Sequence, residues 1–321
     1  MITNPDSAVR MPEKSLGEQY LQALFGPWIS LDLPLACQPV HELVLTGGRL
    51  LQWQISAGYP VWLRWSLHVF LPHSQNENAG RSGRRVLLSP DGCWPHCLSV
   101  AAIEQCKEQD VALAWFDRLA FAHDPPSALR QGAFYEQFSQ SSAGCLSVWA
   151  WGISLTAQVL RELLTDAKIG VIGHSRGGKA ALLCAALDTQ IDAVIANNSG
   201  IGGAASLAVA GEGSEGLAQL AQAFPHWLST AAADSAVQAR LREIDSMTLW
   251  SRIAPRPMLI LQAQQDAWAN PLGTRHAMDC LKSHWPVGGS LTLVERQGTH
   301  TMLAADWHQA ALFMRKPHRG W

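Results

Sequence analysis

The feature that most restricts the fold of this 321-residue chain is a segment in which a strand pattern runs directly into a helix pattern. Residues 169–172 form a short apolar run, and residues 177–187 carry apolar side chains at helical spacing. Between them lies the sequence G-H-S-R-G-G, residues 173–178. Glycines two positions before and after Ser175 leave room for a sharp turn with strained backbone angles. The chain is therefore expected to pass from a buried strand into a helix through a tight turn at this serine.

Short apolar runs and amphipathic runs alternate along the rest of the chain. We expect strands at residues 43–55, 61–71, 86–89, 111–116, 169–172, 191–196, 258–262 and 291–294, and helices at residues 16–25, 98–108, 148–164 and 177–187. This alternation is typical of a mostly parallel central sheet flanked by helices on both faces. Together with the turn at Ser175, it predicts an α/β-hydrolase fold.

The composition is that of one compact globular unit, with 48% hydrophobic and 16% charged residues. We expect residues 1–40 to be an N-terminal extension and residues 41–321 to form a single α/β-hydrolase domain. Two insertions, 117–147 and 198–251, are long for loops of such a fold and are expected to shape its site. The second follows the sixth expected strand and is predicted to form a cap. Of the 14 tryptophans, we expect most in the core and some against a flat substrate.

Serine is a weak nucleophile, so Ser175 requires a base, and the base requires a carboxylate that orients it. In this fold the three residues follow the chain order Ser, Asp or Glu, His. Asp266 comes just after the strand expected at 258–262, and His300 comes just after the last expected strand. Both therefore fall where an open α/β sheet gathers its site. The alternatives are a helix-capping or turn role for Asp266 and an ordinary loop position for His300.

An acyl-transfer site also needs donors for the oxyanion. The backbone N–H of Arg176, directly after the serine, is one candidate. The second is expected from the loop P-D-G-C-W at residues 90–94, at Gly92 or Cys93. The guanidinium of Arg176 has two possible roles, either to add positive charge near the oxyanion or to form a salt bridge on the first helical turn.

The net charge and the cysteines indicate which partners and which cellular location to expect. The net charge is −2, so no overall field attracts nucleic acid, and Arg81, Arg84 and Arg85 are interpreted as part of a solvated, mobile loop at 74–85. The seven cysteines form no paired framework; Cys93 and Cys97 are read as ordinary thiols, with a bridge or a metal as the alternative. No signal peptide or membrane-spanning run is visible, which favours a cytoplasmic protein without a membrane partner.

Several motifs resemble one known family. The sequence H-S-R-G-G-K at 174–179 is similar to the S-R-x-G-K elbow of the glucuronoyl esterases, carbohydrate esterase family 15. The similarity extends to W-A-W-G at 149–152, S-G-I-G-G at 199–203, and the segments 266–271 and 300–307. It covers roughly residues 85–315. The chain also resembles a looser group of acetyl-xylan-esterase-like bacterial hydrolases.

The resemblance implies a serine hydrolase acting on a carbohydrate-linked carboxylic ester. It also implies that the Arg176 side chain assists the oxyanion and that Lys179 faces the substrate, and we add Asn198 and Trp268 as substrate contacts. The chain departs from the family at two positions. Asn198 stands where many members carry Glu as the triad acid, and His174 stands where they usually carry Cys. Since an amide cannot stabilise an imidazolium by charge, Asp266 is expected to be the acid.

The sequence therefore predicts a serine carboxylic ester hydrolase that works through Ser175, His300 and Asp266 and an acyl-enzyme, on short-chain or carbohydrate-linked esters. The alternatives are a glucuronoyl (4-O-methyl-glucuronate) esterase proper, a non-catalytic binding protein on the same fold, and a peptidase or acyltransferase. No cofactor is expected, because the elbow glycines do not follow the nucleotide pattern G-x-G-x-x-G. Likewise, no HExxH sequence or clustered metal motif points to a metal.

Overall fold

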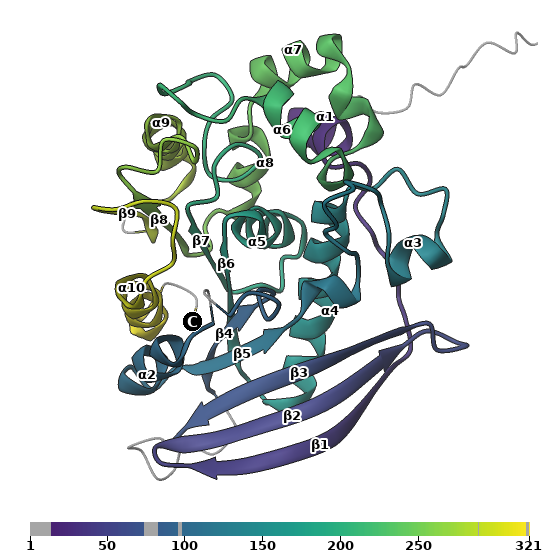
Figure 1. The fold of residues 1–321 in the computed structure, drawn as a ribbon. Helices are drawn as coiled ribbons and strands as arrows, with labels where there is room; N and C mark the ends of the chain where they lie inside the picture. The colour runs from purple at the N-terminus through teal and green to yellow at the C-terminus, as the bar shows by residue number, and fades with distance from the viewer. Residues whose placement is uncertain (1–13, 74–82, 96–97, 288, 319–320) are drawn as a thin grey trace, which may run out of the picture.

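The computed structural model describes residues 14–73, 83–95, 98–287, 289–318 and 321 (Figure 1). Most of the loop expected at 74–85, with Arg81, lies outside the described residues, and so does Cys97. None of the helices in the described ranges has the length and apolar character needed to cross a membrane.

A nine-stranded sheet forms the centre of the molecule, in the order β1-β2-β3-β5-β4-β6-β7-β8-β9. The strands are β1 (Leu35–Leu45), β2 (Gly48–Ala57), β3 (Leu63–Pro72), β4 (Arg85–Ser89), β5 (Ala112–Phe116), β6 (Lys168–His174), β7 (Ala193–Asn197), β8 (Met258–Ala263) and β9 (Leu291–Arg296). From β5 across to β9 all neighbours pair in parallel, whereas β1, β2, β3 and β5 pair antiparallel. The predicted mostly parallel sheet is thus confirmed.

Helices cover both faces of the sheet (Figure 1). They are α1 (Leu16–Leu24), α2 (Val100–Glu108), α3 (Ala133–Gln137), α4 (Cys145–Leu163), α5 (Arg176–Leu187), α6 (Leu217–Ala223), α7 (Ser235–Ile244), α8 (Met247–Trp250), α9 (Pro271–Leu281) and α10 (Ala304–Arg315). Apolar side chains of α4, α5 and α9 belong to one core cluster, and those of α2 and α10 belong to a second. The sheet separates these two cores, as the α/β-hydrolase prediction requires.

One expected strand proves to be a hairpin. Residues 43–55 were expected as a single β-rich run, but the chain reverses at Thr46 and Gly47, where Leu45 pairs with Gly48. Gly47 has a φ of +102°, a left-handed conformation that glycine adopts without a steric penalty. The hairpin adds a strand, so the insertion at 198–251 follows β7 rather than the sixth strand. The expected boundary at residue 40 also falls inside β1.

The insertion at 198–251, called the cap insertion below, is largely helical. It contains α6, α7 and α8, and the N-terminal helix α1 packs on α7 and α8. Ser15 begins α1 with a capping box, in which its hydroxyl accepts from the Glu18 N–H and the Glu18 carboxylate accepts from the Ser15 N–H. The start of the chain therefore supports the cap insertion from outside.

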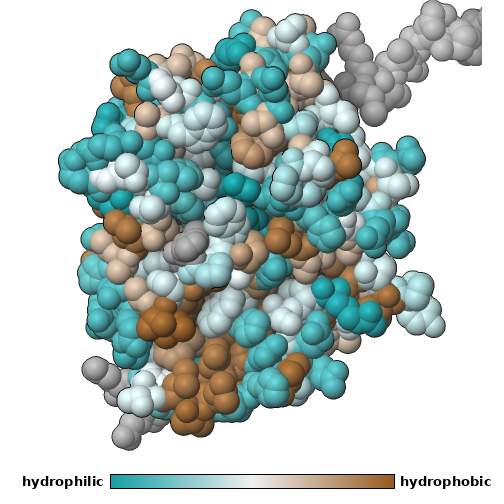
Figure 2. All heavy atoms as spheres, viewed as in Figure 1, coloured by the Kyte–Doolittle hydropathy of each residue, from teal (hydrophilic) through white to brown (hydrophobic). Residues whose placement is uncertain are grey.

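The surface is mostly polar in the view of Figure 2, with apolar residues gathered over α2 and the ends of β1 and β3. Exposed apolar side chains of these elements include Leu43, Val44 and Val100. The pocket at Ser175 lies at the carboxyl ends of the parallel strands β4 to β9.

Trp149 in α4 provides a test of the packing. Its side chain is fully buried, and its indole N–H donates to Ala122 O at 2.8 Å. Trp149→Ala should lower the free energy of unfolding by about 3–5 kcal/mol, because it removes a large core side chain and a buried hydrogen bond. Val44→Ala, at an exposed position, should change it by less than about 0.5 kcal/mol. Denaturant titration measures both, and a loss below about 1 kcal/mol for Trp149→Ala would contradict this packing.

Candidate active site

Ser175 occupies the tight turn between β6 and α5, as the sequence predicts. Its backbone angles, φ 52° and ψ −117°, are strained for a residue with a side chain. A Cβ on Gly173 would lie 2.2 Å from the backbone of Gly177, and a Cβ on Gly177 would lie 2.2 Å from the Asp91 carboxylate. Both glycines are therefore required by close approach, which is what the G-x-S-x-G spacing indicated.

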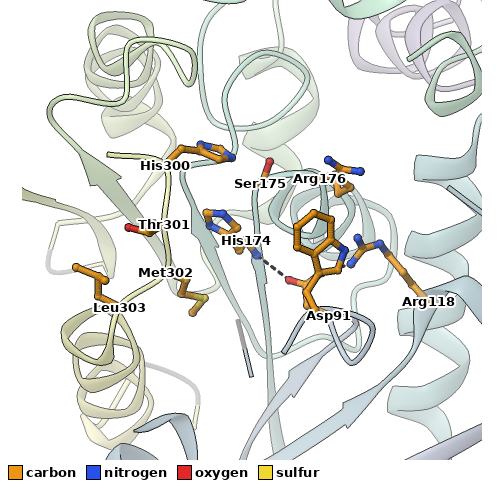
Figure 3. Close-up of a pocket in the computed structure, with 10 residues that line it drawn as sticks. Asp91, Arg118, His174, Ser175, Arg176, His300, Thr301, Met302 and Leu303 are labelled. Carbon is orange, nitrogen blue, oxygen red and sulfur yellow. Dashed lines mark hydrogen bonds and ion pairs between the residues drawn. The ribbon is translucent and has the colours of Figure 1, made fainter. Parts of the chain in front are cut away.

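Two hydrogen bonds from neighbouring segments hold this turn. The Ser175 N–H donates to Asn197 O at 2.8 Å, and the His174 N–H donates to the Asp91 carboxylate at 2.9 Å (Figure 3). The other oxygen of Asp91 accepts from Arg118, and both side chains are almost fully buried. A buried ion pair that loses one partner leaves an uncompensated charge, so Asp91 and Arg118 stabilise the turn only together.

His300 and Asp266 come together from the ends of β9 and β8. The Nδ1 atom of His300 lies 2.6 Å from Oδ2 of Asp266, and the carboxylate is buried while the imidazole is about one-third exposed. The other carboxylate oxygen accepts from the Ala269 N–H at 3.2 Å, so the turn role expected as an alternative coexists with the pairing. Figure 3 shows the His300 ring beside Ser175 at the rim of one pocket. With Nδ1 facing the carboxylate, Nε2 is the nitrogen that can accept a proton.

The Asn198 side chain ties neighbouring segments together, and its expected role as a substrate contact stays a prediction. Its side chain is buried, and its amide nitrogen donates to Thr301 O at 3.1 Å. Its amide oxygen accepts from the Ala263 N–H at 2.7 Å and from Gln262 at 3.3 Å. The side chain lines a pocket, but its hydrogen bonds tie the end of β7 to β8 and to the loop that carries His300.

Two pockets meet at Ser175, Arg176 and His300. The larger, about 360 Å³, is lined also by Trp94, His174, Met302 and Leu303 and is called the Trp94 pocket (Figure 3). The smaller, about 210 Å³, lies toward the cap insertion and is called the Glu215 pocket. Besides the three shared residues, it is lined by Lys179, Asn198, Ser199, Gly200, Glu215, Phe224, Trp227, Trp268 and Ala269. The three shared residues thus lie between two compartments whose walls are both mainly apolar.

A buried ion pair forms the floor of the Glu215 pocket. Lys179 Nζ lies 3.7 Å from Glu215 and donates to Ser199 O and Ile201 O. Burial lowers the pKa of Lys179 and raises that of Glu215, and each charge partly offsets the effect on the other. Lys179 lines the pocket as expected, but its ammonium already donates to two backbone oxygens and pairs with Glu215. Trp268, expected as a substrate contact, also lines this pocket and is about half exposed.

The guanidinium of Arg176 forms a salt bridge, one of its two expected roles. The partner is Asp124 of the 117–147 insertion, not a residue of the first turn of α5. The guanidinium carbon lies 5.0 Å from the ring centre of Trp94 and 4.5 Å from that of Trp227, so aromatic rings flank the cation. Because the side chain lines both pockets, the salt bridge does not remove it from the site.

The prediction that the Gly92 N–H is an oxyanion donor is wrong. Its N–H donates to Phe116 O at 2.9 Å, a bond that joins the loop after β4 to the end of β5 and occupies the donor. The residues of this loop that line the Trp94 pocket are Asp91 and Trp94. Cys93 therefore stays a prediction for the second donor. Its thiol is half-buried, and burial raises the thiol pKa to about 12, so the group is a weak nucleophile.

Four residues of this site carried no usable sequence signal. Asp91 and Arg118 are 27 positions apart, and Asp124 and Glu215 lie in insertions without periodicity. The described residues contain no group of three or more His, Cys, Asp and Glu side chains suited to a metal ion. Asp91 alone of these four lies inside the expected oxyanion loop at 90–94.

The sequence is similar to those of known carbohydrate esterases. A family model described as glucuronyl esterase of fungi matches residues 80–289, about two thirds of the chain. A carbohydrate esterase from an unknown prokaryotic organism is 33% identical over 187 residues, which are 51% of this chain and 42% of that protein. A 4-O-methyl-glucuronoyl methylesterase of Hypocrea jecorina is 30% identical over 171 residues, 50% of this chain and 36% of that protein. The chain thus spans less than half the length of these curated relatives.

Solved structures show the same fold. A glucuronoyl esterase from Solibacter usitatus superposes with a TM-score of 0.77 at 21% identity, covering 94% of this chain and 90% of that one. A promiscuous CE15 esterase from a marine bacterial metagenome superposes with a TM-score of 0.74 at 21% identity, covering 93% and 89%. At this level of identity the likeness establishes the α/β-hydrolase fold.

His174 makes the stability of this site depend on pH. Its ring packs 4.7 Å from that of His300, and its Nδ1 lies 2.6 Å from the Asn197 side-chain oxygen. Burial lowers the pKa of His174 below its ordinary 6.5, although the bond to Asn197 partly opposes this effect. Below about pH 6.5 the unfolded chain therefore binds a proton that the folded chain resists, so the free energy of unfolding should fall as the solution is acidified.

His174→Gln should weaken this pH dependence. Denaturant titrations at about pH 7.5 and about pH 5.5 measure the fall in unfolding free energy for both proteins. The variant should show a smaller fall, because glutamine keeps a hydrogen-bonding amide but does not titrate. Burial also lowers the pKa of His68 and His318, so a residual fall is expected. An equal fall in both proteins would show that His174 does not contribute.

Proposed function

This chain belongs to the glucuronyl esterase family, and on that premise we propose that it is a serine esterase that hydrolyses carboxylic esters of a uronic acid. The single observation that carries the proposal is the placement of Ser175 on a strained turn beside a His300–Asp266 pair, where two pockets meet. The relatives named as 4-O-methyl-glucuronoyl methylesterases support the uronic acid as the acyl part of the substrate.

The geometry suits acyl transfer in two steps. In the first, Ser175 Oγ attacks the ester carbonyl while His300 Nε2 takes the hydroxyl proton. The same proton then passes to the alkoxy oxygen, the bond between carbonyl carbon and alkoxy oxygen breaks, and the alcohol leaves an acyl-serine. In the second step, water gives a proton to His300 and attacks the acyl carbon. The bond between that carbon and Ser175 Oγ then breaks while His300 returns the proton to Oγ, which releases the acid and restores Ser175.

Asp266 and Arg176 have supporting roles in these steps. The buried Asp266 carboxylate holds the imidazole through Nδ1 and stabilises the imidazolium that forms in each step. The Arg176 N–H at the first position of α5 supplies one oxyanion donor, and the helix N-terminus adds favourable field there. The Arg176 guanidinium, at the border of both pockets, adds positive charge near the same oxygen.

The Glu215 pocket suits the sugar part of the substrate. Its volume of about 210 Å³ accommodates one pyranose ring, and Trp268 offers an indole face. One carboxylate oxygen of Glu215 is buried and has no hydrogen-bond partner within the described residues. A sugar hydroxyl can donate to this carboxylate, and Lys179 stabilises its charge. The alcohol part would then extend into the Trp94 pocket on the other side of Ser175.

Ser175→Ala tests the proposed function. The wild-type protein should hydrolyse a glucuronate benzyl ester, and the variant should lose at least about a thousandfold in kcat/KM because no acyl-enzyme can form. Product release is followed by chromatography, with circular dichroism as the control for folding. Near-normal turnover by the folded variant would refute the nucleophile. Wild-type turnover of p-nitrophenyl acetate without turnover of the glucuronate ester would refute the uronic acid.

Asp266→Asn tests the acid. The change keeps the shape and removes the charge, so kcat should fall by about three to four orders of magnitude. Asn198→Ala should cost far less, because an amide at this position can only position the substrate or the loop that carries His300. Restoring the carboxylate as Asn198→Glu in the Asp266→Asn background should recover part of the activity if the site accepts an acid from β7. An almost unchanged kcat in folded Asp266→Asn would show that another residue is the acid.

A further inference from the structure

The Arg176 guanidinium is the point where three parts of the chain meet beside the elbow. It pairs with Asp124 of the 117–147 insertion. Trp94, from the loop after β4, and Trp227, from the cap insertion, place their rings on the cation at 5.0 and 4.5 Å. Trp227 in turn stacks on Phe224 with ring centres 3.9 Å apart and planes 6° from parallel. A long cationic side chain at the site is therefore enclosed by groups from three different segments.

The Asp124 carboxylate links two of these segments directly. One of its oxygens accepts from Arg176, and the other accepts from His226 Nε2 and Trp227 Nε1, each at 2.8 Å. Its side chain is only 9% exposed. Burial alone would raise the pKa of Asp124, but the His226 hydrogen bond and the Arg176 charge outweigh it and hold the pKa well below its ordinary value. The group is therefore a fixed anion with both oxygens occupied.

These contacts restrict the conformations that the Arg176 side chain can adopt. A free arginine at a pocket rim samples many rotamers, and ordering it on substrate binding costs side-chain entropy. A carboxylate takes one side of the guanidinium fork, and flanking rings fix the plane of the fork. The same cation lines both pockets with a side-chain exposure of 22%. Its remaining N–H groups are thus presented to the site before any ligand arrives.

We propose that Asp124 is a positioning residue for Arg176: it fixes the guanidinium beside the oxyanion position and, through His226 and Trp227, makes this placement depend on the cap insertion. The kinetic consequence rests on the proposed esterase function. A group held about 1 Å away from its productive position can cost about a hundredfold in rate, even when the displaced residue is not itself lost. Asp124 is not a lining residue of either pocket; it contacts Arg176 and Trp227, which are, and it acts through Arg176.

A double-mutant cycle tests this role. Asp124→Asn, which leaves an amide that cannot accept from all three donors, should lower kcat on a glucuronate benzyl ester by about 10- to 100-fold. KM should change by less than about threefold, because the effect falls on the transition state. In the Arg176→Lys background the same change should cost less than about threefold further, because there is no guanidinium left to position. Asp192→Asn, which breaks the distant Lys168–Asp192 pair, is the control and should leave kcat unchanged.

Other outcomes would overturn the role. An unchanged kcat in folded Asp124→Asn would do so, as would equal losses in both backgrounds, since additive effects mean that Asp124 does not act through Arg176. If Asp124→Asn does not fold, Trp227→Phe replaces it, because this variant removes the indole donor to Asp124 and keeps an aromatic ring. It should lose several-fold in kcat with Arg176 present and nothing further with Arg176→Lys, and equal losses would again overturn the role.

A spectroscopic readout separates this proposal from the esterase proposal. In the wild-type protein, the Nε–H signal of Arg176 in an arginine-edited NMR spectrum is assigned by its loss in Arg176→Lys. It should shift and broaden in Asp124→Asn and stay in place in Asp192→Asn, whether or not the protein turns over an ester. An unshifted signal in Asp124→Asn would contradict the positioning role. Absent turnover in the wild type would contradict only the proposed function.

Discussion

The strained turn at Ser175 is the constraint on which the rest of the site depends. A positive φ in a residue with a side chain costs about 1–3 kcal/mol and persists only when its surroundings over-determine it. Here the surroundings are two close glycines, a hydrogen bond to the end of β7, and the buried Asp91–Arg118 pair. The carboxylate of Asp91 holds the backbone one residue before the serine. The charged pair therefore stabilises the geometry that a nucleophile requires, rather than a part of the core that apolar residues could fill.

Around this turn, the sheet and the two insertions contribute different parts of the site. The parallel strands bring Ser175, Asp266 and His300 to one edge, where the carboxyl ends of β6, β8 and β9 meet. The insertions supply what the sheet does not, namely the walls of the Glu215 pocket and the carboxylate beside Arg176. Because α1 packs on α7 and α8, the N-terminal segment supports these walls as well. The common fold thus positions the three residues of the proposed triad, and the inserted segments supply walls of the pocket beside them.

Much of this could be predicted from the sequence, because periodic burial and turn chemistry leave a local signature. The alternating strands, the elbow, and the positions of Asp266 and His300 after strands all follow from such patterns. The hairpin at Gly47 was missed because two adjacent β-rich segments look like one when the turn between them is two residues long. Gly92 was misassigned because its N–H partner, Phe116 O, lies on a different strand. Asp124 and Glu215 could not be found, since each acts through a partner distant in sequence.

The central claim is that Ser175 is the nucleophile, activated by the His300–Asp266 pair. Covalent labelling tests it most directly. The protein is incubated with a fluorophosphonate, which reacts with activated serines, and the adduct is located by peptide mass spectrometry. The account predicts one adduct per chain on the peptide that contains Ser175, formed much more slowly in Asp266→Asn, because that variant lacks the charge that supports His300 as the base. Labelling at a different serine, or labelling that is equally fast in folded Asp266→Asn, would contradict the account.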